Sequence, residues 1–276
     1  MSVLAIASAS GLGAAVGFTL ALTGAGGGIV AVPLLMFALH LELAQAAPTG
    51  LLAVGLAAAL GAAIGLREGK VRYRAALLIG GAGMLMAPLG VSLAQHLPNG
   101  PLMVAFAVVL AWSALSMYSR SRGTETGPTA SRRFEQPPCV RSPSTGRLIW
   151  TKPCAWALAS TGLSSGLLSG LLGVGGGFVI VPALTRYSNL AADGVVSTSL
   201  AVIALVSVSG VASAAAHGAI ECATALPFAG GAAAALLAGR RLATRWSGSA
   251  LQRCFAVLCL VVALLLLWRG LLAITA

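Results

Sequence analysis

Charged residues are scarce in this sequence. Only 8% of its 276 residues are charged, whereas a soluble domain has about 25%. Hydrophobic residues make up 58% of the chain, and several apolar runs reach the roughly 20 residues that a helix needs to cross a bilayer. The composition excludes an ordinary soluble protein and predicts an all-α polytopic membrane protein.

A basic region is missing from the start of the chain. Met1 to Thr23 is apolar and contains no Lys or Arg. A secretory signal peptide begins with a positively charged segment. We therefore expect this stretch to be retained as a membrane span.

Patterns typical of catalysis, metal binding and cofactor binding are also missing. The five cysteines have neither zinc-site nor C-x-x-C spacing, so we expect small apolar fillers and no disulfide framework; they are Cys139, Cys154, Cys222, Cys254 and Cys259. The chain lacks a Gly-Lys-Ser/Thr phosphate loop, paired acids and an activated nucleophile. These absences argue against an enzyme, and no cofactor or metal is expected.

The most informative pattern is a pair of glycine-rich segments 149 residues apart. Gly24 to Pro33 reads GAGGGIVAVP, and Gly173 to Pro182 reads GVGGGFVIVP. Each segment interrupts an apolar run. Irregular backbone inside a bilayer is tolerated only where protein or a water-filled cavity covers it. Matching interruptions in two halves of a chain indicate the binding site of a transporter.

The spacing of the two segments divides the chain into repeats. We predict a first transmembrane repeat at 1–118, a basic linker at 119–152 and a second transmembrane repeat at 153–276. The linker carries seven Lys or Arg and four prolines, so it cannot span a membrane. We expect eight long spans and two short half-helices that follow the glycines. The expected long spans are 3–23, 44–66, 75–96, 102–118, 153–172, 194–216, 223–240 and 251–271, and the half-helices are 29–39 and 178–186.

The basic residues predict how the repeats are oriented. The loop 67–74 has four Lys or Arg and its counterpart 217–222 has none, whereas 96–101 has none and its counterpart region 240–253 has four Arg. Lys and Arg concentrate on the cytoplasmic side. The two repeats should therefore have inverted topology in a bacterial inner membrane, with linker 119–152 cytoplasmic and both termini periplasmic.

The glycine segments and nearby hydroxyls are the candidate site. Helix N-termini present unpaired N–H groups and a partial positive charge, so two of them meeting near the midplane could hold a small anion. Hydroxyls at the start of the following spans could donate further hydrogen bonds, although capping or bonding to the helix's own carbonyls is an equal alternative. The predicted anion ligands are Gly24, Gly26, Gly27, Gly28, Thr49, Gly173, Gly175, Gly176, Gly177, Ser197, Thr198 and Ser199.

Other serines are expected to have no role in binding. We predict that they pack between helices or bond to carbonyls of their own helix. They are Ser164, Ser165, Ser169, Ser207 and Ser209.

The doubled signature G-x-x-x-x-x-x-G-x-G-G-G-x-x-x-V-P, at Gly17 to Pro33 and Gly166 to Pro182, resembles the sulfite exporter TauE/SafE family of membrane permeases. The resemblance implies a secondary transporter for a sulfur-containing anion such as sulfite, a sulfonate, sulfoacetate or thiosulfate. It places the anion at the glycine segments, Thr49 and Ser197 to Ser199.

Two alternatives stay open: an anion channel, and a carrier of a non-sulfur organic anion. The expected partners are the small anion, the lipid bilayer and a coupling proton or sodium ion. Twofold assembly is the most frequent oligomeric form, so a homodimer is the default expectation. The basic residues lie in loops between spans, so no nucleic-acid partner is expected.

Overall fold

The computed structural model describes residues 3–24, 26–39, 41–122, 139, 151–188, 192–217, 222–246 and 249–275. Helices account for nearly all of these residues, and within the described ranges the only extended pairing is an isolated bridge between Cys139 and Ser188. The predicted all-α class of a polytopic membrane protein is confirmed.

Ten helices are present in the described ranges. In the first half they are α1 Val3–Thr23, α2 Gly26–Ala38, α3 Leu43–Arg67, α4 Tyr73–His96 and α5 Asn99–Arg122. In the second half they are α6 Lys152–Leu172, α7 Gly177–Tyr187, α8 Ala192–Ala216, α9 Cys222–Trp246 and α10 Ser249–Thr275.

Two of these helices are short, as predicted: α2 has 13 residues and α7 has 11. Five segments within the described residues are long and apolar enough to span a membrane: Gln45–Arg67, Tyr73–His96, Lys152–Leu172, Asp193–Ala216 and Ala256–Ala273. One boundary differs in a way that matters. Helix α2 starts at Gly26 rather than Ile29, so three glycines form its first turn instead of preceding it. Each glycine costs a helix interior about 1 kcal/mol relative to alanine, but the close packing described below leaves no room for a Cβ atom at Gly27 or Gly28.

Large apolar side chains cover the outside of the bundle. Leu85 and Trp156 are each 72% exposed, and Trp268 is 68% exposed. Soluble monomers rarely expose contiguous apolar surface on this scale. These side chains therefore face the lipid, and the core lies where α2, α3, α7 and α8 meet.

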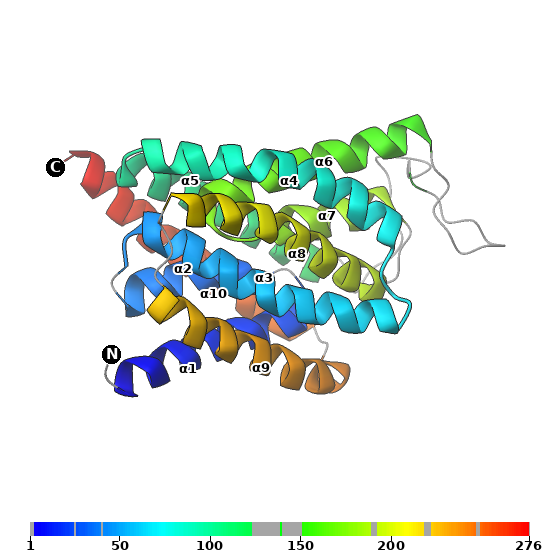
Figure 1. The fold of residues 1–276 in the computed structure, drawn as a ribbon, viewed down its shortest axis with the longest axis horizontal. Coiled ribbons are helices and arrows are strands. Elements are labelled where there is room, and N and C mark those ends of the chain that lie inside the picture. Colours follow the sequence, from blue (N-terminus) through cyan, green and yellow to red (C-terminus); the bar gives the residue numbers. More distant parts are fainter. Residues whose placement is uncertain are drawn as a thin grey trace.

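Helices of the first half pack mainly against helices of the second half. Helix α1 packs along α9, and α6 packs along α4, while α3 and α8 pack together at the centre (Figure 1). The contacts repeat with the sequence: Gly13 lies against Phe228, and Gly162 lies against Ile79. Each of these glycines is 149 residues from its equivalent, and so is each of their neighbours. The sequence repeat is therefore also a repeat of packing.

Equivalent helices run in opposite directions. Along the α3–α8 contact, Gly55 faces Ser207 and Gly65 faces Ser197, so residue numbers rise on one helix as they fall on the other. Likewise Gly270, near the end of α10, lies against Gly100 at the start of α5. Halves with the same orientation would place equivalent helices in parallel. The antiparallel packing is the arrangement that an inverted repeat produces.

Two of the basic regions lie together at one end of the bundle. Arg240 Nη1 donates a 2.6 Å hydrogen bond to the Gly61 carbonyl, and its Nη2 lies 3.5 Å from the Glu68 carboxylate. Lys70 Nζ lies 2.9 Å from the same carboxylate, and its hydrogen bond lowers the pKa of Glu68. The start of α1 and the end of α10 lie at the opposite end (Figure 1). This grouping fits the predicted topology, and which end is cytoplasmic stays a prediction.

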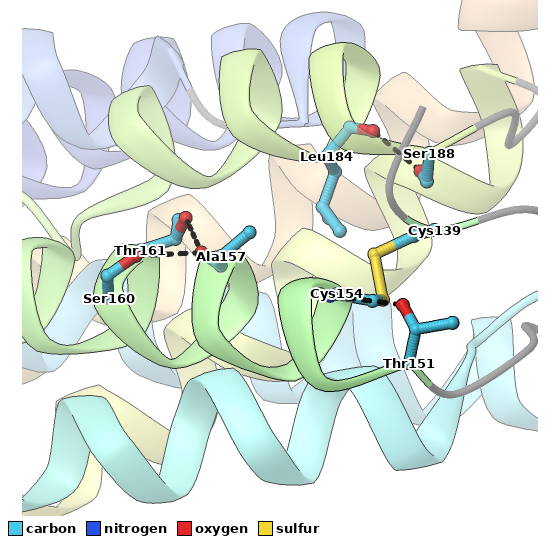
Figure 2. The surroundings of a disulfide bond; sticks show 8 residues. All are labelled: Cys139, Thr151, Cys154, Ala157, Ser160, Thr161, Leu184 and Ser188. Carbon is cyan, nitrogen blue, oxygen red and sulfur yellow. Dashed lines mark hydrogen bonds between the residues drawn. A yellow bond between two sulfur atoms is a disulfide. The ribbon is translucent and has the colours of Figure 1, made fainter. Parts of the chain in front are cut away.

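A disulfide joins Cys139 to Cys154 at the start of α6, with Cα atoms 5.1 Å apart (Figure 2). The Cys139 N–H also donates to the Tyr187 carbonyl at the end of α7, at 3.1 Å. The expectation that cysteines are only apolar fillers is therefore wrong for this pair. Sequence spacing cannot show the approach of two Cβ atoms that pairing requires. Cys259 is a buried free thiol, and the side chains of Cys222 and Cys254 lie outside the described residues.

Candidate functional site

Each half contains a helical hairpin whose turn starts with a glycine. Gly24 and Gly173 have φ of 71° and 70°, the left-handed conformation that favours glycine. Their N–H groups donate 2.8 Å hydrogen bonds to the carbonyls of Leu20 and Ser169. This is the usual way in which a glycine ends a helix. These two predicted ligands therefore have a structural role, which is to end α1 and α6 and redirect the chain.

The second turn leads into a helix N-terminus. Gly175 and Gly176 have φ of 76° and 67°, and Gly176 is the N-cap of α7. Gly177 is buried in the first turn of that helix. The first N–H groups of a helix have no carbonyl partner within it, and they carry its positive end. This end of α7 is suited to an acceptor group, above all an anion.

The two glycine segments meet inside the bundle. A Cβ atom on Gly28 would overlap the carbonyl oxygen of Val174, and one on Gly175 would lie 3.3 Å from Val54 and 3.0 Å from Ile203. Val54 and Ile203 are each the twelfth residue of a 25-residue helix, α3 and α8 respectively. The structure thus brings the start of α2 and the turn before α7 together, level with the middles of the two central helices.

Close packing explains several of the glycines without any ligand. A Cβ on Gly24 would lie 2.6 Å from a methyl group of Val196, and one on Gly173 would overlap the backbone of Ala47. A Cβ on Gly27 would lie 2.5 Å from the Cβ of Leu20. Gly26 lies in the first turn of α2. Small residues at these positions let helices approach closely, as is common in membrane proteins.

A mostly apolar pocket reaches the second glycine segment. It lies between α3, α4, α5, α6 and α8, and its lining includes Ala47, Pro48, Leu51, Gln95 and Gly173. Its lining therefore includes residues from the Gln95 end of α4 and from the turn that precedes α7.

The predicted hydroxyls divide into two groups. Thr49 is buried and donates to the Gln45 carbonyl at 2.9 Å, which is the alternative considered from the sequence. Ser199 donates to carbonyls of Val196 at 2.8 Å and Gly24 at 3.2 Å, so it touches the first glycine turn.

The other two predicted hydroxyls face the basic end. Thr198 accepts a 3.1 Å hydrogen bond from the Arg72 N–H, in the turn between α3 and α4. Ser197 packs against Gly65 near the end of α3. These contacts join α8 to α3 and to the α3–α4 turn.

Two serines differ from the others in the group that we expected to pack between helices or to bond to carbonyls of their own helix. Ser164, Ser165 and Ser209 do donate to carbonyls of their own helices. Ser169 and Ser207 are 0% and 2% exposed, and neither Oγ atom has a hydrogen-bond partner. The sequence offered no signal for this difference, because the i−3 and i−4 carbonyls are available to any helical serine.

The long apolar helices of each half pack against those of the other half, and they surround two helical hairpins that meet at the centre. This arrangement defines a polytopic membrane protein with the organisation of a transporter. The model of the sulfite exporter TauE/SafE family matches residues 9–266, and the chain belongs to this family.

Two relatives from Xylella fastidiosa carry the name "Probable membrane transporter protein". The one from strain 9a5c is 29% identical over 273 residues, and the one from strain Temecula1 is 28% identical over 274 residues. In both cases the match covers 98% of each chain. No solved structure matches. The family and these relatives identify the protein as a membrane transporter rather than an enzyme.

Proposed function

We propose that this protein is a secondary transporter that moves a small sulfur-containing oxyanion across the bacterial inner membrane by alternating access. Sulfite, a sulfonate, sulfoacetate and thiosulfate are the candidate substrates. The observation that carries the proposal is the meeting of Gly28 with the Val174 carbonyl, level with the middles of α3 and α8. There the first turn of one half-helix lies beside the turn that starts the other.

The chemistry of this meeting point suits an anion in an uncharged site. The sequence from Leu43 to Leu66 contains no charged residue, and neither does that from Gly194 to Ala216. Lys and Arg are costly in the bilayer interior. Backbone N–H groups at a helix start supply hydrogen bonds and partial positive charge instead, and transporters with broken helices hold anionic groups in this way.

The exchanged packing supports a mechanism in two parts. The α1–α9 and α4–α6 pairs each link the two halves, while α3 and α8 form the shared centre. In the proposed cycle, the paired helices and hairpins tilt against this centre and expose the site first to one side and then to the other. A proton or sodium gradient would supply the energy. Both chain termini would lie in the periplasm, and a homodimer is the proposed assembly.

Reconstituted protein tests the substrate directly. Proteoliposomes are loaded with buffer, and the uptake of labelled sulfite, thiosulfate and sulfoacetate is measured beside that of labelled acetate. The proposal predicts saturable uptake of at least one sulfur oxyanion above protein-free vesicles. Uptake of acetate alone would favour the carrier of a non-sulfur organic anion. Currents far above carrier turnover in planar bilayers would favour the channel.

A further inference from the structure

The side chain of Ser169 is enclosed without a hydrogen-bond partner. The residue is 0% exposed, and its buried Oγ makes no hydrogen bond. Buried hydroxyls in proteins are nearly always hydrogen-bonded, and an unmet one lowers stability. A neighbouring serine of the same helix, Ser165, avoids that cost by donating to the Gly162 carbonyl. The hydroxyl of Ser169 is therefore available to a group that is not part of the protein.

The glycine turn before α7 passes beside Ser169. The turn begins where the Gly173 N–H bonds to the Ser169 carbonyl. By Gly176 it has returned to the level of Ser165, because a Cβ on Gly176 would lie 2.6 Å from the Ser165 carbonyl oxygen and 3.1 Å from its Cβ. Residues four apart on a helix share a face. Ser169 lies one helical turn after Ser165 on the same face of α6, and the glycine turn returns along this face.

In the first half, the equivalent positions hold apolar side chains. The residues 149 positions before Ser165 and Ser169 are Val16 and Leu20. Both are fully buried, and a Cβ on Gly27 would lie 2.5 Å from the Leu20 Cβ. The two hairpins therefore have similar backbones but differ in polarity, because serines of α6 take the places that Val16 and Leu20 hold in α1.

We propose that Ser169 is a substrate ligand, and that its hydroxyl donates a hydrogen bond to an oxygen of the transported oxyanion held at the N-terminus of α7. This inference rests on the proposed function and makes the site one-sided. The second hairpin binds the anion, and the first packs against it. A hydroxyl donor beside helix N–H groups selects an anion that presents several oxygen acceptors.

The test compares three variants in proteoliposomes with labelled sulfite and labelled thiosulfate. Ser169→Ala should raise KM about 10-fold or more, the loss expected for one hydrogen bond to a charged group, with a smaller change in maximal rate. Ser169→Cys, a weaker donor of similar size, should fall between alanine and the wild type. Ser164→Ala is the matched control, because this exposed serine of the same helix already bonds to the carbonyls of Ser160 and Thr161.

Thermal unfolding separates binding from structure. If Ser169 is a ligand, Ser169→Ala removes an unmet hydroxyl and leaves the melting temperature equal or higher. An unchanged KM in Ser169→Ala, or a lowered melting temperature with a parallel loss in all kinetic parameters, would overturn the proposal. Absence of uptake by the wild-type protein, for every sulfur oxyanion, would instead count against the proposed function.

A second, independent observation concerns the disulfide. Cys139 is bonded to Cys154 at the start of α6 and forms an isolated β-bridge with Ser188 at the end of α7 (Figure 2). Its N–H donates to the Tyr187 carbonyl. One residue from the region between the halves therefore ties together the two ends of the second hairpin. The first hairpin has Ala5 at the position equivalent to Cys154.

We infer that this disulfide is a redox-controlled clamp on the second hairpin. The basic linker is predicted to be cytoplasmic, where disulfides are rare and mostly transient or redox-sensing. Two equivalents of a small thiol would reduce it by exchange. The first thiolate attacks one sulfur, forms a mixed disulfide with that cysteine and releases the other cysteine as a thiolate. The second thiolate attacks the small-thiol sulfur of the mixed disulfide, which releases the remaining cysteine as a thiolate and forms the small-molecule disulfide. The protein is left with two thiols, and the ends of α6 and α7 are free to separate.

Transport before and after dithiothreitol tests the clamp. The reduced wild-type protein should transport labelled sulfite faster than the oxidised protein, at the rate of Cys154→Ser, which should not respond to the reagent. Equal rates for oxidised and reduced wild type would overturn the inference. In whole cells, labelling of the reduced pair by a membrane-impermeant maleimide would place it in the periplasm, and this result would show a structural disulfide rather than a switch.

Discussion

Replacing Gly173 with alanine probes the close approach of the second hairpin to α3. The structure assigns two costs to this change. Alanine in the left-handed conformation at φ 70° costs roughly 1–2 kcal/mol. Its Cβ would also overlap the Cα, carbonyl carbon and oxygen of Ala47, and overpacking of this kind costs typically about 1–3 kcal/mol. We expect Gly173→Ala to lower the free energy of unfolding by about 2–5 kcal/mol.

The chain offers a matched control for this prediction. Gly69, in the turn after α3, has a similar φ of 67°, but a Cβ there would have nothing within 4 Å. Gly69→Ala therefore carries only the conformational cost of about 1–2 kcal/mol. Unfolding of both variants is followed by circular dichroism in mixed micelles of mild and denaturing detergent. A loss for Gly173→Ala that is no larger than that for Gly69→Ala would refute the contact with Ala47.

Three further predictions follow from local contacts. Gly24→Ala meets a side chain rather than backbone, the methyl groups of Val196, so adding Val196→Ala should recover part of the stability that Gly24→Ala loses; failure of this rescue in the same unfolding assay would contradict the contact. Cys154→Ser opens a disulfide with a sequence separation of 15 and should cost about 3 kcal/mol, measured against the oxidised wild type; an equal stability would mean that the bond does not constrain the unfolded chain. Lys70 lowers the pKa of Glu68, so the ion pair should stabilise the protein at neutral pH, and this stabilisation should be lost as the pH falls through the lowered pKa. The effect should be small because the Glu68 side chain is 40% exposed. A Glu68→Gln variant that shows the same loss of stability at low pH would contradict the assignment.

Much of the fold could be predicted because the bilayer restricts the choices. Unpaired backbone is costly in lipid, so apolar runs become helices, and α1 and α6 end at or within one residue of their predicted limits. The repeat was visible in the sequence because both halves need a glycine at the same left-handed turn, Gly24 in the first half and Gly173 in the second. Periodic and conformational constraints of this kind leave a clear mark on the sequence.

Features that depend on which side chains meet could not be predicted. Cys139 and Cys154 gave no spacing signal, and their pairing depends on where the chain returns to α6. Ser165 and Ser169 look alike in the sequence, yet one is bonded within its helix and the other is not. Thr198 was considered equally as an anion ligand and as a capping or back-bonded hydroxyl, and nothing in the sequence indicated the hydrogen bond that it accepts from the Arg72 N–H. Each of these outcomes is set by three-dimensional neighbours that local patterns do not encode.

Counterflow of labelled sulfite tests the central claim of an alternating-access carrier most directly. Proteoliposomes are preloaded with a high concentration of unlabelled sulfite and diluted into a trace of labelled sulfite. A carrier exchanges one anion for another through the same site, so labelled sulfite should accumulate transiently above its external concentration. Equilibration of the label without overshoot, together with measurable sulfite permeation, would contradict the account and indicate a pore.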